Sequence, residues 1–464
     1  MNGISKKPFV TDRLQNQNQY MRKVFTSQEY QPCGECMTEM KKEADYIVEQ
    51  IDRHHDWFGD SLPMIASENL ISPLAREMLV SDFHDRYAEG LPGERYYNGN
   101  IYVDKVEIKT VELAKKLFKC NHADVRPTSG TVANLGLLKA LGKHGDNITH
   151  CALSDGAHIS TAKFGAVGLR GLVSHTYPFD THEMNIDVDG ARRTILEVKP
   201  KIALFGLSVF LFPAPIKDLK DALDEVGCYV WYDGAHVLGL IAGGKFQDPL
   251  REGAEVITAS THKTFPGPQH GILIANPRDE KMEKSLNAGI FPGVTSNHHL
   301  HAMAALGISL AEHIEFGAEY AEQVIRNSKA LGQALHERGI KVLCEHKGFT
   351  ASHIIAIDVE EHGGGQPCSQ LLEDSNIIAN MNMLPRDTKP KSPSGIRLGS
   401  QELTRIGMKE SHMAEVAELI FRIVAKKESP DIVKKDVIKL KGDFKTIQYC
   451  FNAGHPAYER FHLV

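Results

Sequence analysis

Between about residue 63 and residue 317 the chain alternates short apolar runs with segments of helical periodicity, and this alternation constrains its fold most strongly. The apolar runs lie at residues 201–206, 228–233, 255–259 and 271–275. Such runs are typical of strands buried on both faces, and strands that alternate with helices form mostly parallel sheets. The sequence therefore predicts an α/β domain on a mostly parallel central sheet, with helices at 131–142, 189–198, 216–226 and 303–336.

The two ends of the chain have different patterns. Towards the C-terminus, predicted strands near 341–345, 352–359, 376–383 and 395–399 precede a predicted helix near 408–427, which indicates a smaller α+β domain. The first 38 residues are polar and rich in Gln and Asn, and a helix is predicted near 37–54. We therefore expect an N-terminal arm and helix at 1–62, a large domain at 63–317 and a small α+β domain at 318–464.

Composition narrows the class of protein. The chain has 464 residues, 42% of them apolar, and a net charge of −6, which argues against nucleic acid as its main partner. No apolar run reaches the roughly 18 residues that a membrane span needs, and the N-terminus lacks the apolar core of a signal peptide. We expect a cytoplasmic protein that binds neither membrane nor nucleic acid.

Cysteine and histidine clusters do not predict a metal site. Eight cysteines in a chain of this length are not a disulfide framework. Cys33 and Cys36 form one Cys-x-x-Cys without a second pair nearby, so we interpret them as structural rather than as a redox pair or half of a metal site. His298, His299 and His301 lack a paired carboxylate, and we expect no metal there.

A lysine and an aspartate follow two of the predicted strands. Lys263 comes shortly after the run at 255–259, and Asp233 ends the run at 228–233. Ligands of parallel sheets bind at the carboxyl edge, where a lysine can form a Schiff base with an aldehyde cofactor. Pyridoxal 5′-phosphate (PLP) also needs an acidic partner for its pyridine nitrogen. Each residue alone has a simpler interpretation, a solvated surface lysine and a helix-capping aspartate, but together they favour a PLP site.

A third element could hold the phosphate of such a cofactor. Ser129, Gly130 and Thr131 open a predicted helix, where backbone N–H groups and hydroxyls can bind an anion. Ordinary helix capping is the alternative. An upstream phosphate loop followed by Asp233 and Lys263 is the layout of fold type I PLP enzymes.

Around and beyond these three elements, the sequence resembles a known family, the serine hydroxymethyltransferases. The motifs follow in the family's order over roughly residues 40–430, and they are Met64-Ile-Ala-Ser67-Glu-Asn69, Tyr87-Ala-Glu89-Gly-Leu-Pro-Gly-Glu-Arg-Tyr96-Tyr97, Ser129-Gly-Thr-Val-Ala-Asn134, Gly156-Ala-His158, Tyr232-Asp-Gly-Ala-His236, Ser260-Thr-His-Lys263-Thr264 and Ser394-Gly-Ile-Arg397-Leu-Gly399. The resemblance implies a fold type I PLP transferase that interconverts serine and glycine. The carbon unit would pass to tetrahydrofolate or tetrahydromethanopterin.

The resemblance also implies a role for each site residue. It implies PLP binding by Lys263 as a Schiff base, by Asp233 at the pyridine nitrogen, by His158 on the ring face, by Ser208 and His236 at the phenolic oxygen, and by Ser129, Gly130 and Thr131 at the phosphate. Arg397 and Ser67 would bind the substrate carboxylate, Glu89 would shuttle a proton with Tyr97 beside it, and Asn382 would touch the pterin. In this family Tyr87, Glu89 and Tyr97 reach the site from the partner subunit, which implies a homodimer, alone or within a tetramer.

Some segments depart from the common pattern of the family. The residues after Lys263 read Phe265-Pro-Gly-Pro-Gln269-His270, and a later loop reads Phe291-Pro-Gly-Val-Thr-Ser-Asn-His298. These departures resemble the archaeal branch. Two alternatives stay open, a threonine aldolase or transaldolase on the same scaffold and a non-catalytic scaffold homologue. The sequence does not separate the two pterins.

Overall fold

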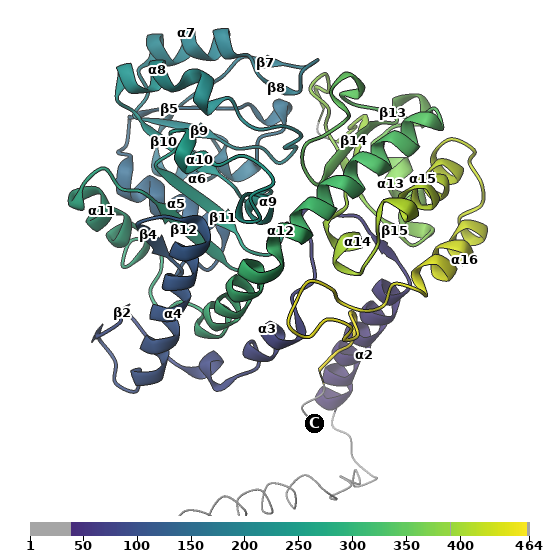
Figure 1. Ribbon diagram of the computed structural model, residues 1–464, viewed down its shortest axis with the longest axis horizontal. Coiled ribbons are helices and arrows are strands. Elements are labelled where there is room, and N and C mark those ends of the chain that lie inside the picture. The colour runs from purple at the N-terminus through teal and green to yellow at the C-terminus, as the bar shows by residue number, and fades with distance from the viewer. Residues whose placement is uncertain (1–38, 390, 462–464) are drawn as a thin grey trace, which may run out of the picture. The chain divides into compact units, whose positions relative to one another are not determined.

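A computed structural model gives the fold of residues 39–389 and 391–461 (Figure 1). Cys33 and Cys36 lie outside these described residues. The chain divides into two compact units at His54 and His55. The boundary falls inside helix α2 (Glu39–Gly59), which has no buried side chain. In the described residues, no helix combines the length and the apolar character needed to cross a membrane.

A seven-stranded sheet forms the centre of the second unit, as the alternating pattern predicts. Its strands in spatial order are β4 (His122–Asp124), β12 (Gly271–Ala275), β11 (Val256–Ser260), β10 (Tyr229–Asp233), β9 (Ile202–Phe205), β5 (Asn147–His150) and β6 (Val173–Thr176). The strands from β11 to β6 pair in parallel, whereas β12 runs antiparallel to both of its neighbours. The predicted sheet is therefore confirmed as mostly parallel.

Helices precede, connect and follow these strands, and all but the first of them contribute apolar side chains to the cores that contain the sheet. They are α3 (Pro73–Met78), α4 (Ile101–Phe118), α5 (Gly130–Leu141), α6 (Ala166–Arg170), α7 (Val188–Val198), α8 (Ile216–Val226), α9 (Leu238–Ala242), α10 (Pro249–Glu252) and α11 (Glu280–Ile290). Short 3-10 turns lie at η1 (Asp82–Asp85), η2 (Leu153–Asp155) and η3 (Ile159–Thr161). Two hairpins, β2 (Gly90–Leu91) with β3 (Glu94–Arg95) and β7 (Phe179–Asp180) with β8 (Asn185–Ile186), stand apart from the central sheet.

A four-stranded antiparallel sheet follows in the C-terminal part. Its order is β13 (Lys341–Val342), β14 (Ile354–Asp358), β17 (Gly395–Gly399) and β16 (Asn380–Asn382). The helices of this part are α13 (Gly365–Asp374), α14 (Gln401–Arg405), α15 (Glu410–Val424) and α16 (Pro430–Lys441), with 3-10 turns η4 (Glu345–Lys347) and η5 (Glu360–His362). The segment predicted as one strand at 376–383 is two strands, because β15 (Ile377–Ile378) pairs with β1 (Leu62–Pro63) instead.

Helix α12 (Leu300–Glu337) contributes to the hydrophobic cores of both sheets. Val324 belongs to the core that includes β9 and β10, and Leu331 belongs to the core that includes β14 and β17. The second core also contains Leu62 and Met64, from β1 and the residue after it. The predicted domain boundary at residue 317 stays a prediction. The side chains of α12 change from the first core to the second between Val324 and Leu331.

Candidate functional site

A cavity of about 440 Å³ lies at the carboxyl edge of the central sheet. Strands β10 and β11 are parallel neighbours in which Asp233 pairs with Thr258, so Asp233 and the segment after Ser260 leave the sheet at the same edge. Ten of the predicted site residues line this cavity, namely Ser67, Ser129, Gly130, Thr131, His158, Ser208, Asp233, His236, Lys263 and Arg397. The structure thus brings together residues that are up to 330 positions apart in the chain, from Ser67 to Arg397.

Lys263 lies in a tight loop between β11 and β12. Inside this loop the Thr261 hydroxyl donates to the Pro268 carbonyl at 2.7 Å, and the Gly267 N–H donates to the Thr261 carbonyl at 2.8 Å. From outside it, the Asn69 amide donates to the Lys263 carbonyl at 2.6 Å. The lysine backbone is therefore fixed while its amine faces the cavity.

Burial lowers the pKa of the Lys263 amine to about 8, because water no longer solvates the ammonium form. The Asp233 carboxylate opposes this shift and the Arg397 guanidinium adds to it. An ordinary lysine has a pKa near 10.4. A much larger fraction of the Lys263 side chain is therefore a neutral nucleophile at physiological pH.

Asp233 is held by neighbours on both of its oxygens. The Asn134 amide donates to Oδ2 at 2.9 Å, and the Ala235 N–H donates to Oδ1 at 3.1 Å. Gly206 sits so close that a Cβ there would lie 2.7 Å from the Asp233 Cβ. The sequence reasoning did not assign a role to Asn134, although its spacing from Gly130 places both on one face of α5.

The N-terminus of α5 faces the same cavity. Ser129 caps the helix, its hydroxyl accepting from the Val132 N–H at 3.2 Å. A Cβ on Gly130 would lie 3.0 Å from the Ser260 nitrogen, so glycine lets the helix start approach β11 closely. The capping interpretation is therefore correct for Ser129, and the free N–H groups of the first turn remain suited to an anion.

His158 and His236 reach the cavity from two loops. The His158 Nδ1 accepts from the Ser160 N–H at 3.1 Å, so the proton of the neutral ring lies on Nε2. Burial lowers the pKa of His158, and it lowers the pKa of His236 well below its usual value with further repulsion from Lys263 and Arg397. Both rings are therefore neutral at physiological pH. The His236 Nδ1 and the Ser208 hydroxyl are buried without a hydrogen-bond partner.

Arg397 enters from β17, in the second sheet. Its Nη1 donates to the Ser208 carbonyl at 2.9 Å and its Nη2 to the Asn380 side chain at 3.3 Å, while its Nε is buried and unpartnered. Burial lowers the pKa of Arg397 to about 10, with no carboxylate offsetting the loss of water. Arg397 lines the cavity, and a buried guanidinium with one N–H left without a partner is suited to an anionic ligand such as a carboxylate.

The segment that carries Ser67 is fastened to the start of α14. The Gln401 amide donates to the carbonyls of Ile65 and Glu68, at 2.7 Å each. Gly399 approaches so closely that a Cβ there would lie 2.6 Å from the Ala66 Cα. Glu68 also lines the cavity, and burial raises the pKa of its carboxyl. The sequence motif contains Glu68, but no spacing distinguished it from a structural acid.

Other cavity residues were also missed. Ser260 and His262 shortly precede Lys263 in the same motif, and Gln269 returns to the cavity at the end of the loop. The first two could have been found by their proximity to Lys263. Gln269 gives no signal in sequence, because only the folded loop brings it back.

Four predicted site residues lie outside this cavity. Glu89 lines a second cavity of about 510 Å³, together with Tyr96 and residues 291–296. The rings of Tyr87 and Tyr97 pack together with centroids 4.7 Å apart. Asn382 lies on β16, where its amide donates to the Met383 carbonyl at 2.6 Å. Single-chain geometry does not bring these four residues to Lys263, and their predicted roles stay predictions.

The histidines that the sequence singled out have other surroundings. His298 is buried, and its Nε2 lies 3.1 Å from the Glu107 carboxylate. The rings of His299 and His301 stack with centroids 5.7 Å apart. His298 therefore has a carboxylate partner that sequence spacing, at a separation of 191 residues, does not reveal.

The fold and the cavity have the features that define fold type I PLP enzymes, with a lysine after one parallel strand, an aspartate ending its neighbour and an anion-binding helix start. Comparison with known proteins is more specific. The family profile of serine hydroxymethyltransferase matches residues 40–420, and this chain belongs to that family.

Three relatives illustrate how much of the chain is covered. The protein of Thermoplasma volcanium is 54% identical over 420 residues, which is 90% of this chain and 98% of the relative. That of Methanopyrus kandleri is 53% identical over 89% of this chain and 96% of the relative. That of Methanothermobacter thermautotrophicus is 51% identical over 86% of this chain and 93% of the relative. Each carries the name serine hydroxymethyltransferase, and the archaeal resemblance is confirmed.

One prediction follows from the buried amine of Lys263. Because only the neutral amine attacks an aldehyde, the rate at which cofactor-free protein takes up PLP should rise with pH and reach half of its maximum near pH 8. Stopped-flow absorbance of the bound chromophore measures this rate. An Asp233→Asn variant should move the midpoint lower, because the carboxylate raises the pKa of Lys263. A midpoint near pH 10 in the unmodified protein would contradict the effect of burial.

Proposed function

We propose that this chain is a PLP-dependent serine hydroxymethyltransferase, which interconverts serine and glycine and transfers the one-carbon unit to a reduced pterin. The observation that carries the proposal is the convergence of Lys263, Asp233, the α5 N-terminus and Arg397 on one cavity. Family membership over most of the chain and relatives of that name support the same activity.

The residues of the cavity fit PLP in its charge and its shape. Ser129, Gly130 and Thr131 line the cavity at the start of α5, where backbone N–H groups can bind a phosphate, and the unpartnered Ser208 hydroxyl and His236 Nδ1 offer hydrogen bonds to a polar ligand atom. Lys263 would hold the cofactor covalently and Asp233 would pair with its pyridine nitrogen, oriented by Asn134. When bound, PLP supplies a cationic ring that withdraws electrons from the amino acid.

The substrate amino acid would be oriented by this chain's own side chains. Arg397 and Ser67 line the same cavity, and Arg397 has an unpartnered Nε–H with which it could bind a carboxylate. Since Asn380 and the Ser208 carbonyl hold the guanidinium, its donors are preorganised. The neutral His158 and His236 rings can hold hydrogen bonds without adding charge near the amine of Lys263.

We propose further that the active unit is a homodimer in which Tyr87, Glu89 and Tyr97 complete the site of the partner subunit. The surface around them supports this, because Tyr96, Ile101 and Tyr102 are each more than 70% exposed. Exposed aromatic and aliphatic side chains gathered in one segment are typical of interfaces. Residues of two chains would then take part in the transfer of the one-carbon unit. Glu89 would donate or accept a proton, and Asn382 would contact the pterin.

The cytoplasm is the compartment that we propose. All six cysteines within the described residues, which are Cys120, Cys151, Cys228, Cys344, Cys368 and Cys450, are unpaired and buried. Unpaired thiols suit a reducing compartment.

The test is serine-to-glycine conversion by the purified protein with no pterin, with tetrahydrofolate and with tetrahydromethanopterin. We expect strong stimulation by one pterin, which would also name the carbon acceptor. If neither pterin stimulates the reaction while threonine or phenylserine is cleaved, the protein is an aldolase or transaldolase instead. Absence of the visible absorbance of lysine-bound PLP would indicate a non-catalytic homologue.

A further inference from the structure

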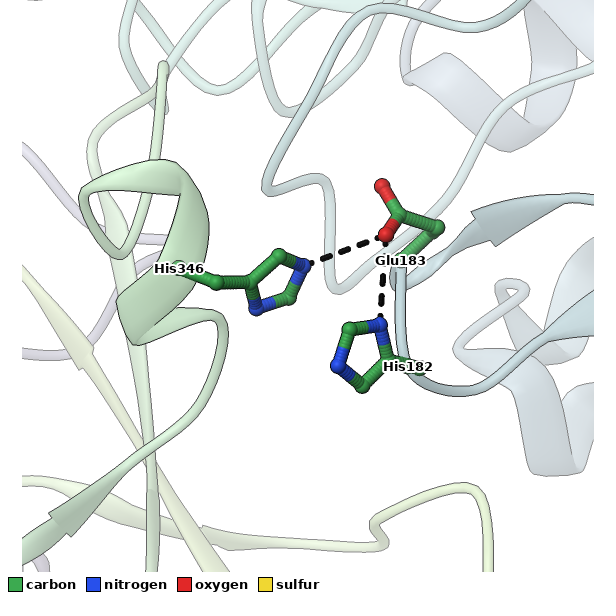
Figure 2. Close-up of side chains that lie close together, drawn as sticks. All are labelled: His182, Glu183 and His346. Carbon is green, nitrogen blue, oxygen red and sulfur yellow. Dashed lines mark hydrogen bonds and ion pairs between the residues drawn. The ribbon is translucent and has the colours of Figure 1, made fainter.

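Three side chains that belong to no site described above gather where two distant segments meet. His182 and Glu183 lie in the turn between β7 and β8, and His346 lies in η4 (Figure 2). The Glu183 Oε1 is 3.2 Å from the His182 Nδ1 and 3.2 Å from the His346 Nε2. The three ligand atoms all lie within 4.8 Å of one another. None of the three residues lines the cavity that contains Lys263.

The spacing of these atoms suits a single metal ion. In a tetrahedral zinc site with bonds of about 2.0–2.1 Å, neighbouring ligand atoms are about 3.3–3.4 Å apart. The two separations from Glu183 Oε1, 3.2 Å each, are within about 0.2 Å of this value, and the two ring nitrogens lie within 4.8 Å of each other. Two imidazoles and one carboxylate are also a ligand set that zinc and related divalent metals accept, with the fourth position left to water.

The two oxygens of the Glu183 carboxylate have different partners. Lys347 binds one oxygen of the carboxylate, with its Nζ 3.0 Å from Oε2, and also donates to the Glu183 carbonyl at 3.1 Å. The partners of Oε1 are the two imidazole nitrogens. Each neutral ring can carry its proton on its other nitrogen instead, which leaves the nitrogen near Oε1 able to bind a metal.

Buried neighbours position the backbone on both sides of the cluster. Met184 follows Glu183, and Cys344 precedes His346 by two residues, and both are buried in one apolar cluster with Phe212. The Cys344 thiol contacts the His182 carbonyl at 3.8 Å, and the two imidazole rings stack with centroids 4.1 Å apart. His182 and His346 are exposed to solvent and Glu183 is partly buried, and the segments that carry them pack on the buried apolar cluster.

We propose that His182, Glu183 and His346 form a binding site for a divalent transition metal of the zinc type. The metal would connect the β7–β8 turn to η4, two segments that are 163 residues apart in the chain. Its role would be to hold the segment before β14 against the large-sheet part of the molecule. This site is independent of the proposed activity.

The test is a titration of the chelator-treated, PLP-loaded full chain with Zn²⁺, followed by calorimetry, and with Co²⁺, followed by visible absorbance. Because cysteines and histidines are zinc ligands wherever they occur in a chain, the result is the difference in metal binding between variants. His346→Asn should bind one equivalent of metal less than the unmodified chain. If it still binds that equivalent, its affinity should fall by more than the roughly 10–100-fold that loss of an outer-shell partner costs. His455→Asn, at an exposed histidine elsewhere, is the matched control and should bind like the unmodified chain.

Lys347 provides a test with the opposite sign. Because its ammonium competes with a metal for the charge of Glu183, Lys347→Gln should bind Zn²⁺ more tightly than the unmodified chain. Zn²⁺ should also raise the thermal unfolding midpoint of the unmodified chain and not that of His346→Asn. The proposal is wrong if three variants bind Zn²⁺ with the same stoichiometry and affinity as the unmodified chain, namely His182→Asn, Glu183→Gln and His346→Asn. The cluster would then be a surface hydrogen-bond network that binds no metal. Weaker binding by Lys347→Gln would count against the site as well.

Discussion

A Lys263→Ala variant is expected to lose multiple turnover of serine, by on the order of 10⁴–10⁶-fold in kcat, the range seen when a covalent catalytic group is removed. The reason is that Lys263, at the carboxyl edge of β11, is the only lysine among the described residues that line the cavity, and a primary amine is needed to form a Schiff base with the cofactor. Without it, PLP would be held by Asp233 and the α5 N-terminus alone. The visible absorbance of lysine-bound cofactor should disappear with the activity.

Two companion variants separate chemistry from folding and charge. Lys263→Arg keeps a cation beside Asp233 but provides no nucleophile, so it should be as inactive as Lys263→Ala. Lys281→Arg, at an exposed lysine on α11, should behave like the unmodified protein. Circular dichroism and thermal unfolding should be near those of the unmodified chain for all three. Retained multiple-turnover activity in Lys263→Ala would remove the basis of the proposed function.

The sequence predicted the central sheet well because its strands are buried on both faces. The runs at 201–206, 228–233, 255–259 and 271–275 each contain the observed strand to within about a residue at either end. What apolarity does not encode is direction, so the antiparallel course of β12 appeared only in the structure. The C-terminal part was predicted less accurately, since Cys344 has a φ of 59° and ends the strand that was expected to reach residue 345.

The core of the site was predictable because its residues follow recognisable local signals. Asp233 and Lys263 end or follow apolar runs, and Ser129 to Thr131 open a helix. Arg397 has no local signal of this kind, and its position next to Ser208 depends on the packing of β17 against a loop that lies 189 residues earlier. Only the resemblance to a family identified it before the structure did.

Supporting residues were harder to predict than the residues they support. Asn134 holds Asp233, Asn69 holds the Lys263 loop, and Gln401 holds the Ser67 segment. Each acts through an amide hydrogen bond to a residue far away in sequence. Amide side chains occur on any polar surface, so no pattern of composition or periodicity marks the ones that are used in this way.

Mixing two inactive chains should restore activity if the site is shared between subunits. Glu89→Gln and Lys263→Ala are each expected to be inactive in pterin-dependent transfer, with Glu89→Gln still binding PLP. In a heterodimer of the two, one site would combine the intact Lys263 of one chain with the intact Glu89 of the other. Co-expression with two different tags, followed by tandem purification, should therefore give about half of the unmodified activity per dimer.

The matched control is a heterodimer of Lys263→Ala with Arg397→Lys. Both of these residues line the same single-chain cavity, so each of the two sites would carry one defect and no activity should return. Restoration by the Glu89→Gln pairing alone would therefore assign Glu89 to the neighbouring subunit's site, where a single chain does not place it. If neither pairing restores activity, Glu89 acts within its own chain, and the exposed segment around Tyr96 and Tyr102 needs another explanation.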